Sequence, residues 1–274
     1  MTEPPEPAPA AWWSEIADGV LVRRHRELDL STGLVIGTRS CLVIDTGGDH
    51  RQGAALAAAV RERTSLPWAV VYTHAHFDHC FGTEAFLPCP VWAHERLPAV
   101  LRATASAQRD QWSTHYRDEG RPDLADALSA SRAVPPDRTV TDHVEVDLGG
   151  RTVVLEHLGR GHTDHDLIVT VPDVDVVFTG DLIEQGAPPA FEDSFPRDWA
   201  ALAAGLAERG SAVTRFVPGH GRPVDIAFVR TQAAQLRTLV EHAAALGAVS
   251  YAAEEGPTHP FGAAVVRTAA DRLR

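Results

Sequence analysis

Residues 70–82 read VVYTHAHFDHCFG and place three histidines and one aspartate in six consecutive positions, directly after a β-branched run. In an extended segment, residues two apart point the same way, so His74 and His76 can present their imidazoles to one ion while Phe77 packs elsewhere. Asp78 and His79 then face a second point nearby. Imidazole combined with carboxylate is typical of Zn²⁺, Fe or Mn sites rather than Ca²⁺ or Mg²⁺ sites. The loop therefore predicts a transition-metal site, because such a cluster at a buried strand end would otherwise carry a desolvation cost.

One loop supplies too few side chains for two ions, so further ligands are expected later in the chain. Three short stretches offer them: GRGHTDHD contains His162, VVFTGDL contains Asp181 and FVPGHGRP contains His220. Each stretch lies next to a strand-like run, and functional residues of α/β sheets collect in the loops at strand ends. Asp181 ends a very apolar run, where a carboxylate is costly to bury unless it is paired or ligated.

Apolar, β-branched runs alternate with Ala-rich helical segments along most of the chain, which indicates an α/β fold. We expect strands at 19–25, 32–37, 41–46, 68–73, 143–148, 151–158, 166–171, 174–180 and 213–219, and helices at 51–64, 198–210 and 225–246. Between about 94 and 133 the chain turns polar and helical, which predicts a helical insertion between two β-rich halves. Two similar β/α halves indicate one layered domain, expected over 14–274 after a disordered, proline-rich tail at 1–13.

Composition narrows the class of protein. The 274 residues are 44% hydrophobic and 23% charged, as in an ordinary globular protein, and no run approaches the roughly 20 apolar residues that span a bilayer. The N-terminus lacks the features of a secretory signal, and three cysteines are too few for a disulfide framework, so a cytoplasmic protein is expected. A net charge of −12 disfavours nucleic acid and favours a small-molecule substrate. The sequence leaves open whether the chain forms a homodimer.

The order of the motifs, HxHxDH, then Gly-His-Thr, then an aspartate after a strand, then Gly-His-Gly, resembles the metallo-β-lactamase superfamily of metallohydrolases. The resemblance extends over about 19–246 and implies a four-layered αββα sandwich with metals at one edge of the sheets. It implies that Asp45, in the stretch VIDTGG, supports the site from behind without binding metal. It further implies one metal on His74, His76 and His162, a second on Asp78, His79 and His220, and Asp181 as the bridge between them.

The resemblance also implies an activity, that of a dinuclear hydrolase in which a metal-bridging hydroxide attacks an ester-like bond. Two zinc ions are expected, with iron or manganese as alternatives, and Asp78 is the expected catalytic residue, orienting the hydroxide and accepting its proton. Known β-lactamases usually carry Cys or Ser where Asp181 stands, and the oxygen-reducing diiron members carry Glu where His76 stands. What remains is similar to glyoxalase II-like and lactonase-like hydrolases of thioesters and lactones. The alternatives are a mononuclear iron sulfur dioxygenase of the same superfamily and a polyketide cyclase-type enzyme.

Several neighbouring segments have two interpretations each. Asp164 and His165 follow the Gly-His-Thr motif and either support the site or form a solvated turn. The aromatic and proline-rich segment 185–199 either walls a substrate pocket or packs in the core. The helical insertion, with Trp112 and Tyr116, either caps the pocket as a mobile cover or lies over the sandwich. As a mobile cover it would shape substrate choice without supporting the chemistry.

Overall fold

Side chains that alternate along the strands point to opposite faces of two β-sheets. In neighbouring pairs such as Leu34 and Val35, or Val70 and Val71, the first residue belongs to one buried apolar cluster and the second to another. Both faces of these strands are buried, which explains why the strands read as nearly continuous apolar runs in the sequence. The fold is therefore a stack of layers with the two sheets in its interior.

The computed structural model describes residues 13–247 and 259–273. The first sheet has seven strands in chain order, β1 (Trp13–Ala17), β2 (Val20–Arg24), β3 (Ser31–Ile36), β4 (Cys41–Ile44), β5 (Trp68–Val71), β6 (Val91–His94) and β7 (Arg138–Val140). The second sheet has the order β12 (Arg215–Pro218), β11 (Val176–Gly180), β10 (Ile168–Val171), β9 (Thr152–Glu156) and β8 (His143–Asp147). Pairing is parallel from β4 to β7 and between β11 and β12, and antiparallel elsewhere.

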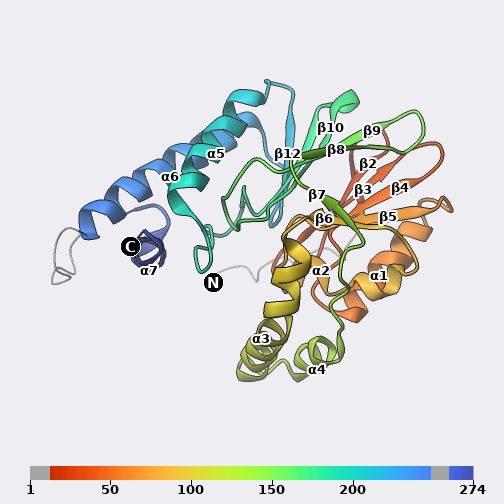
Figure 1. Ribbon diagram of the computed structural model, residues 1–274, viewed down its shortest axis with the longest axis horizontal. Helices are drawn as coiled ribbons and strands as arrows, with labels where there is room; N and C mark the ends of the chain where they lie inside the picture. The colour runs from red at the N-terminus through yellow and green to blue at the C-terminus, as the bar shows by residue number, and fades with distance from the viewer. Residues whose placement is uncertain (1–12, 248–258, 274) are drawn as a thin grey trace, which may run out of the picture.

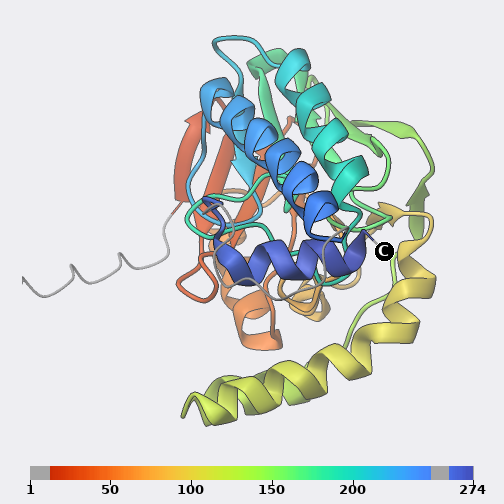
Figure 2. The ribbon, with the colours of Figure 1, turned by 90° about the vertical axis from the view of Figure 1, so that its left-hand side faces the viewer.

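Helices cover the outer face of each sheet, as Figure 1 shows. On the side of the first sheet lie α1 (His50–Arg61), α2 (Phe77–Cys80), α3 (Leu97–Asp118) and α4 (Pro122–Ala130). On the side of the second sheet lie α5 (Pro196–Arg209), α6 (Ile226–Gly247) and α7 (Gly262–Arg272), with α7 crossing α6 in Figure 2. Two 3₁₀ helices, η1 (Thr83–Phe86) and η2 (Pro172–Val174), complete the described elements.

Three buried apolar clusters match the three interfaces between the four layers. One cluster joins the first sheet to α1, α3 and α4, a second lies between the two sheets, and a third joins the second sheet to α5, α6 and α7. This confirms the predicted αββα sandwich. The apolar stripe of each helix explains its position, because burying that stripe against a sheet is the main source of its stability.

The helical insertion corresponds to α3 and α4, and the two helices pack into the core rather than forming a separate cover. Leu101, Tyr116 and Leu128 are each at most 3% exposed and belong to the same apolar cluster as the outer face of the first sheet. Trp112 packs against the Phe77 ring, with the two ring centroids 4.8 Å apart. The inner faces of the two helices therefore belong to the core, and a role of the segment as a cover over the substrate stays a prediction.

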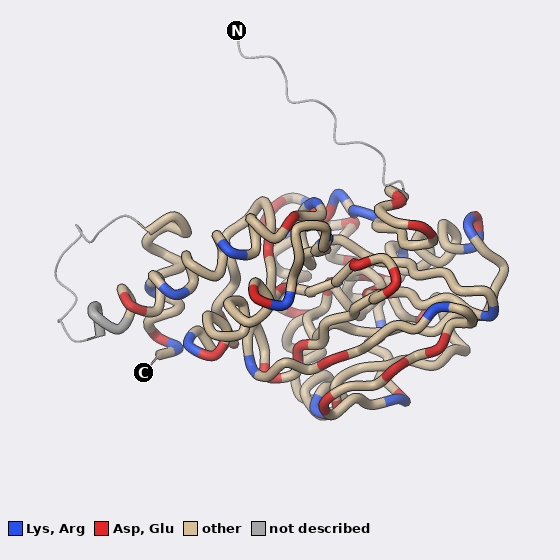
Figure 3. Tube along the Cα trace, turned by 90° about the horizontal axis from the view of Figure 1, so that it is seen from above, with Lys and Arg blue, Asp and Glu red and all other residues tan. Residues whose placement is uncertain are grey.

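Most predicted strands and helices are present within a few residues of their expected limits. The sequence prediction missed β1, β6, β7 and α7, all of which are short or lie at the ends of the described chain. It also expected an extended segment at the HxHxDH motif, where the structure has bends followed by the short helix α2. The predicted tail at 1–13 falls outside the described residues, except that Trp13 begins β1. Figure 3 shows acidic and basic residues interspersed along the described trace. Among the described helices, none combines the length and the apolar character required to cross a bilayer.

Candidate metal centre

Four segments of the chain bring the seven predicted metal-binding residues to one edge of the two sheets. The HxHxDH turn follows β5, which lies between the parallel strands β4 and β6. His162 lies in the connection between β9 and β10, Asp181 directly follows β11, and His220 follows β12, the parallel neighbour of β11. Within each sheet the carboxyl ends of the parallel strands meet at one edge, and the stacking of the two sheets makes residues more than 100 positions apart in the chain neighbours.

The first group consists of His74, His76, His162 and Asp181. The Nδ1 atom of His76 lies 3.0 Å from the Nε2 atoms of both His74 and His162. Asp181 Oδ2 lies 3.7 Å from His74 Nε2 and 3.5 Å from His162 Nε2. Ligand atoms about 2.0–2.1 Å from one tetrahedral ion lie about 3.3 Å from one another, so the spacing fits a single ion.

The second group consists of Asp78, His79 and His220, and Asp181 reaches it as well. Asp78 Oδ2 lies 3.6 Å from His79 Nε2 and 3.4 Å from His220 Nε2. Asp181 Oδ1 lies 3.3 Å from His79 Nε2, and Asp181 Oδ2 lies 3.4 Å from His220 Nε2. The carboxylate of Asp181 therefore stands between the two groups, with oxygens near imidazoles of both.

Asp45 fixes two of the imidazoles from behind. His79 Nδ1–H donates to Asp45 Oδ2 at 2.8 Å, and Thr73 Oγ1–H donates to the same oxygen at 2.8 Å. His74 Nδ1–H donates to Thr73 Oγ1 at 3.1 Å. The Nε2 atoms of His74 and His79 are left with lone pairs that face the centre, as metal binding requires. Asp45 has a φ of 59°, a left-handed backbone conformation that non-glycine residues seldom adopt, and such conformations cluster at functional sites.

In two further histidines, a hydrogen bond on one ring nitrogen also directs the other nitrogen towards the centre. His220 Nδ1–H donates to the carbonyl of Leu28 at 2.7 Å, so its Nε2 faces Asp181 and Asp78. His76 is turned the other way round: its Nε2–H donates to Asp193 Oδ2 at 3.0 Å, and its Nδ1 faces the centre. A carboxylate or carbonyl on the far nitrogen fixes the tautomer and raises the basicity of the inward nitrogen.

The residues present fit a metal ion, and the hydrogen bonds around the centre show why. The inward nitrogens of His74 and His76 both carry lone pairs at 3.0 Å from each other, a contact that is repulsive unless a cation lies between them. His79 Nε2 and Asp181 Oδ1 are buried and make no hydrogen bond. Buried polar atoms are costly without a partner, and a metal ion would give each of them one.

The imidazoles at the centre differ in pKa, and the difference does not follow the two groups, because Asp193 outweighs burial and raises the pKa of His76. Burial lowers the pKa of His162 to about 4 and holds that of His74 well below its usual range. Burial also disfavours the charged form of His220, but the carboxylates of Asp181 and Asp78 outweigh it and raise the pKa of His220 to about 10. Although burial alone would raise the pKa of Asp181, the surrounding imidazoles hold it well below its usual range, so this carboxylate stays ionised.

Gly219, in the Gly-His-Gly turn, is required by the close approach of Asp181. A Cβ atom on Gly219 would lie 1.8 Å from Asp181 Oδ1, so only glycine leaves room for the carboxylate. Gly221 has a φ of +87°, which favours glycine on conformational grounds as well. The two glycines therefore allow the side chains of His220 and Asp181 to approach each other closely.

The structure shows how two segments pack for which the sequence left alternative interpretations. Phe191 and Trp199 are 1% and 0% exposed and belong to the core beneath α5 and α6, so 185–199 packs in the core at these positions. His165 is buried and accepts a hydrogen bond from the backbone N–H of Ala75 at 3.2 Å, so it is no solvated turn.

Three residues near the centre escaped sequence reasoning. Asp193 bonds His76, Gln108 bonds the backbone on both sides of His76, and Asp166 accepts hydrogen bonds from Thr163 beside His162. Burial raises the pKa of Asp166 to about 7. Asp166 could have been found from the sequence, because it lies four residues from His162 in the same motif. Gln108 and Asp193 carried none, since they lie 32 and 117 positions from His76.

Comparison with known proteins agrees with this geometry. The family described as the Metallo-beta-lactamase superfamily matches residues 26–220. The chain belongs to the metallo-beta-lactamase superfamily. The superfamily is metal-dependent, typically with zinc, and the chain is a metallohydrolase-fold enzyme.

Curated relatives carry several activities in their names. The chain is 24% identical over 200 residues to metallo-beta-lactamase type 2 of Bacillus sp. (strain 170), covering 71% of this chain and 68% of that protein. It is 25% identical to a linear primary-alkylsulfatase of Pseudomonas sp. over 67% of this chain and 40% of that protein. Among solved structures, a metallo-beta-lactamase from Pontibacter korlensis has a TM-score of 0.67 at 18% identity, covering 83% of this chain and 99% of that one.

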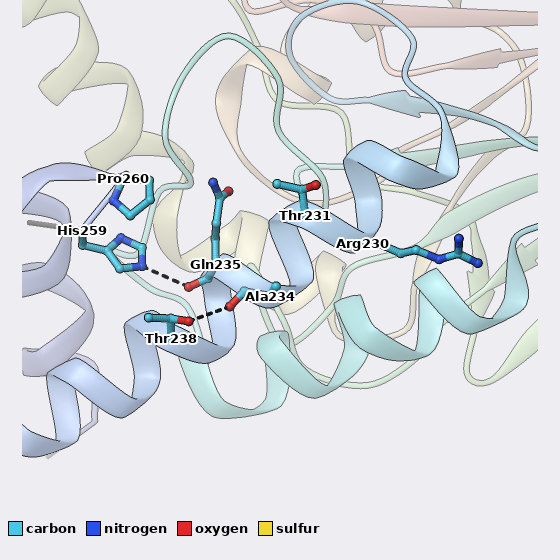
Figure 4. A pocket seen from close by; sticks show the side chains of 7 residues that line it. All are labelled: Arg230, Thr231, Ala234, Gln235, Thr238, His259 and Pro260. Atoms are coloured by element: carbon cyan, nitrogen blue, oxygen red, sulfur yellow. Dashed lines mark hydrogen bonds between the residues drawn. The ribbon is translucent and has the colours of Figure 1, made fainter.

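A separate surface pocket lies between α6 and the chain just before α7, and Figure 4 shows it at close range. His259 Nε2–H donates to the carbonyl of Gln235 at 3.1 Å across one end of this pocket. The lining residues are Arg230, Thr231, Ala234, Gln235, Thr238, His259 and Pro260. None of them belongs to the candidate metal centre, so the pocket plays no part in the chemistry proposed below.

Proposed function

We propose that the chain is a dinuclear metal-dependent hydrolase of an ester-like bond, a thioester or a lactone, in a small molecule. One observation carries the proposal: the carboxylate of Asp181 lies within 3.7 Å of imidazole nitrogens in both groups, as a bridge between two ions requires. The seven proposed metal-binding residues are His74, His76, Asp78, His79, His162, Asp181 and His220.

Two bound metal ions would supply a nucleophilic hydroxide near neutral pH and would polarise the scissile carbonyl. The chain's own contribution to proton transfer is Asp78. Its carboxylate is held 3.4 Å from His220 Nε2 and is 8% exposed, so it has one fixed position at the centre. From there Asp78 would orient the attacking hydroxide, accept its proton as the tetrahedral intermediate collapses, and return that proton to the departing thiolate or alkoxide.

The substrate class rests on two features of the chain. The family resemblance implies Cys or Ser in place of Asp181 in β-lactamases, so the residue at this position favours another ester-like bond over a β-lactam. The net charge of −12 and the interspersed surface charges favour a small or neutral substrate over a polyanion. Because named relatives include a β-lactamase and an alkylsulfatase, the test includes both of those substrate classes.

We expect protein purified from zinc-replete medium to contain two zinc ions per chain by elemental analysis. At free metal about 100-fold above Kd, each ion adds about 2.7 kcal/mol to stability, so removing both by chelation should lower Tm by about 10–20 °C. Restoring zinc should restore Tm. Protein without bound metal, or an unchanged melting curve after confirmed metal removal, would contradict the proposal.

The activity is tested by assaying zinc-restored protein against a thioester, a lactone, a β-lactam and an alkyl sulfate under identical conditions. We expect the highest kcat/KM for the thioester or the lactone. A preference for the β-lactam or the sulfate would keep the metal centre but overturn the proposed substrate. One iron per chain together with oxygen consumption on a thiol substrate would point instead to the sulfur dioxygenase.

A further inference from the structure

Gln108, on α3 of the helical insertion, pairs with the backbone on both sides of His76. The N–H of Phe77 donates to Gln108 Oε1 at 2.8 Å, and Gln108 Nε2–H donates to the carbonyl of Ala75 at 3.0 Å. The second hydrogen of the amide donates to Thr104 Oγ1 at 3.0 Å, one turn earlier on the same helix. These three bonds use both ends of the amide, so its orientation is fixed by its partners.

His165 holds the same short stretch from the other side. The N–H of Ala75 donates to His165 Nε2 at 3.2 Å, so this nitrogen must be unprotonated. The proton is therefore on Nδ1, which donates to Asp164 Oδ1 at 2.9 Å, and Arg96 Nη1–H donates to the other carboxylate oxygen at 2.7 Å. A charged pair at the surface thus fixes the tautomer of a buried histidine that bonds the backbone between His74 and His76.

The hydrogen bonds of Gln108 and His165 to the backbone at 75–77 support the first metal group more than the second. The second group is held by Asp45, behind His79, and by the Leu28 carbonyl, behind His220. In the first group, His74 is held through Thr73 and His76 bonds Asp193, but the His76 side chain is 29% exposed, so its position also depends on the backbone at 75–77. A ligand that is displaced by more than about 0.5 Å loses its productive geometry.

We propose that Gln108 and His165 are positioning residues that fix the backbone around His76. They thereby raise the metal affinity of the first group and leave that of the second group nearly unchanged. The inference rests on the proposed function, since it requires that both groups bind metal. It assigns to the helical insertion a role in the metal centre, carried by one amide side chain. Outer residues of this kind typically change metal affinity by about 10- to 100-fold when they are replaced.

The test is a titration of metal-stripped protein with Zn²⁺ against a chromophoric chelator, which resolves two dissociation constants. We expect Gln108→Leu and His165→Leu each to weaken one of the two binding steps by about 10- to 100-fold and to leave the other within about threefold. His165→Gln should restore most of the affinity, because its Oε1 can accept the Ala75 N–H. The matched control is Gln111→Leu, an exposed position on the same helix, which should change neither step.

Cobalt substitution gives a second measurement that loss of stability alone would not change. We expect the visible absorption of the first Co²⁺ equivalent to change in both leucine variants and to return in His165→Gln. If Gln108→Leu fails to fold, Gln108→Glu takes its place, since it keeps the acceptor for the Phe77 N–H but lacks the donor for the Ala75 carbonyl. Unchanged dissociation constants in folded variants, or equal weakening of both steps, would overturn the inference. Wild-type protein that binds no Zn²⁺ would instead overturn the proposed function.

Discussion

Asp181→Ala should lose both metal ions and lower kcat/KM by on the order of 10³-fold, which corresponds to about 4 kcal/mol of transition-state stabilisation. The reason is that the Asp181 oxygens lie 3.3–3.7 Å from the inward nitrogens of four histidines, so a single substitution removes a ligand from each group. Elemental analysis and steady-state kinetics on the same preparation measure the two effects together.

Two other aspartates provide the comparison for this variant. Asp164→Ala leaves every proposed ligand in place and removes the partner of His165 and Arg96, so its effect on metal content and activity should be much smaller. Asp198→Ala removes a surface ion pair with Arg160, at a side chain that is 42% exposed, and should change neither quantity. Equal losses in the Asp181 and Asp164 variants would mean that Asp181 is not the bridge.

Tyr116→Ala should destabilise the metal-free protein by about 3 kcal/mol, as expected for deleting a buried aromatic side chain. Tyr116 is 3% exposed and packs in the cluster between the first sheet and its covering helices, although it belongs to the helical insertion. Urea unfolding in the presence of chelator measures the change without a contribution from metal binding.

The control for Tyr116 is Val213→Ala, at a side chain that is 74% exposed, which should stay within about 0.5 kcal/mol of the parent protein. Tyr116→Phe keeps the ring in the core and should retain most of the stability. If Tyr116→Ala unfolds at the same urea concentration as the parent protein and changes only KM for a bulky substrate, the insertion is a cover after all.

The sequence by itself determined the candidate ligands and the architecture. His74, His76, Asp78 and His79 could be identified because the HxHxDH turn is local and follows a β-branched run, although Asp78 and His79 lie in the short helix α2 and not in the extended segment that was expected. His162, Asp181 and His220 were readable because each lies at a strand end. The αββα layers followed from the family resemblance, and the alternation of strands and helices agrees with it.

Tertiary structure alone decided how the centre is held. Asp193 and Gln108 reach His76 and its flanking backbone across 117 and 32 residues, and no local pattern marks a glutamine on a helix as a partner of a distant loop. Tyr116 and Trp199 became core residues because helices fold back over a sheet, which depends on long-range packing. Short-range periodicity shows which residues lie on the same face of a helix or strand. Which other helix or sheet packs against that face depends on long-range contacts that form only when the layers assemble.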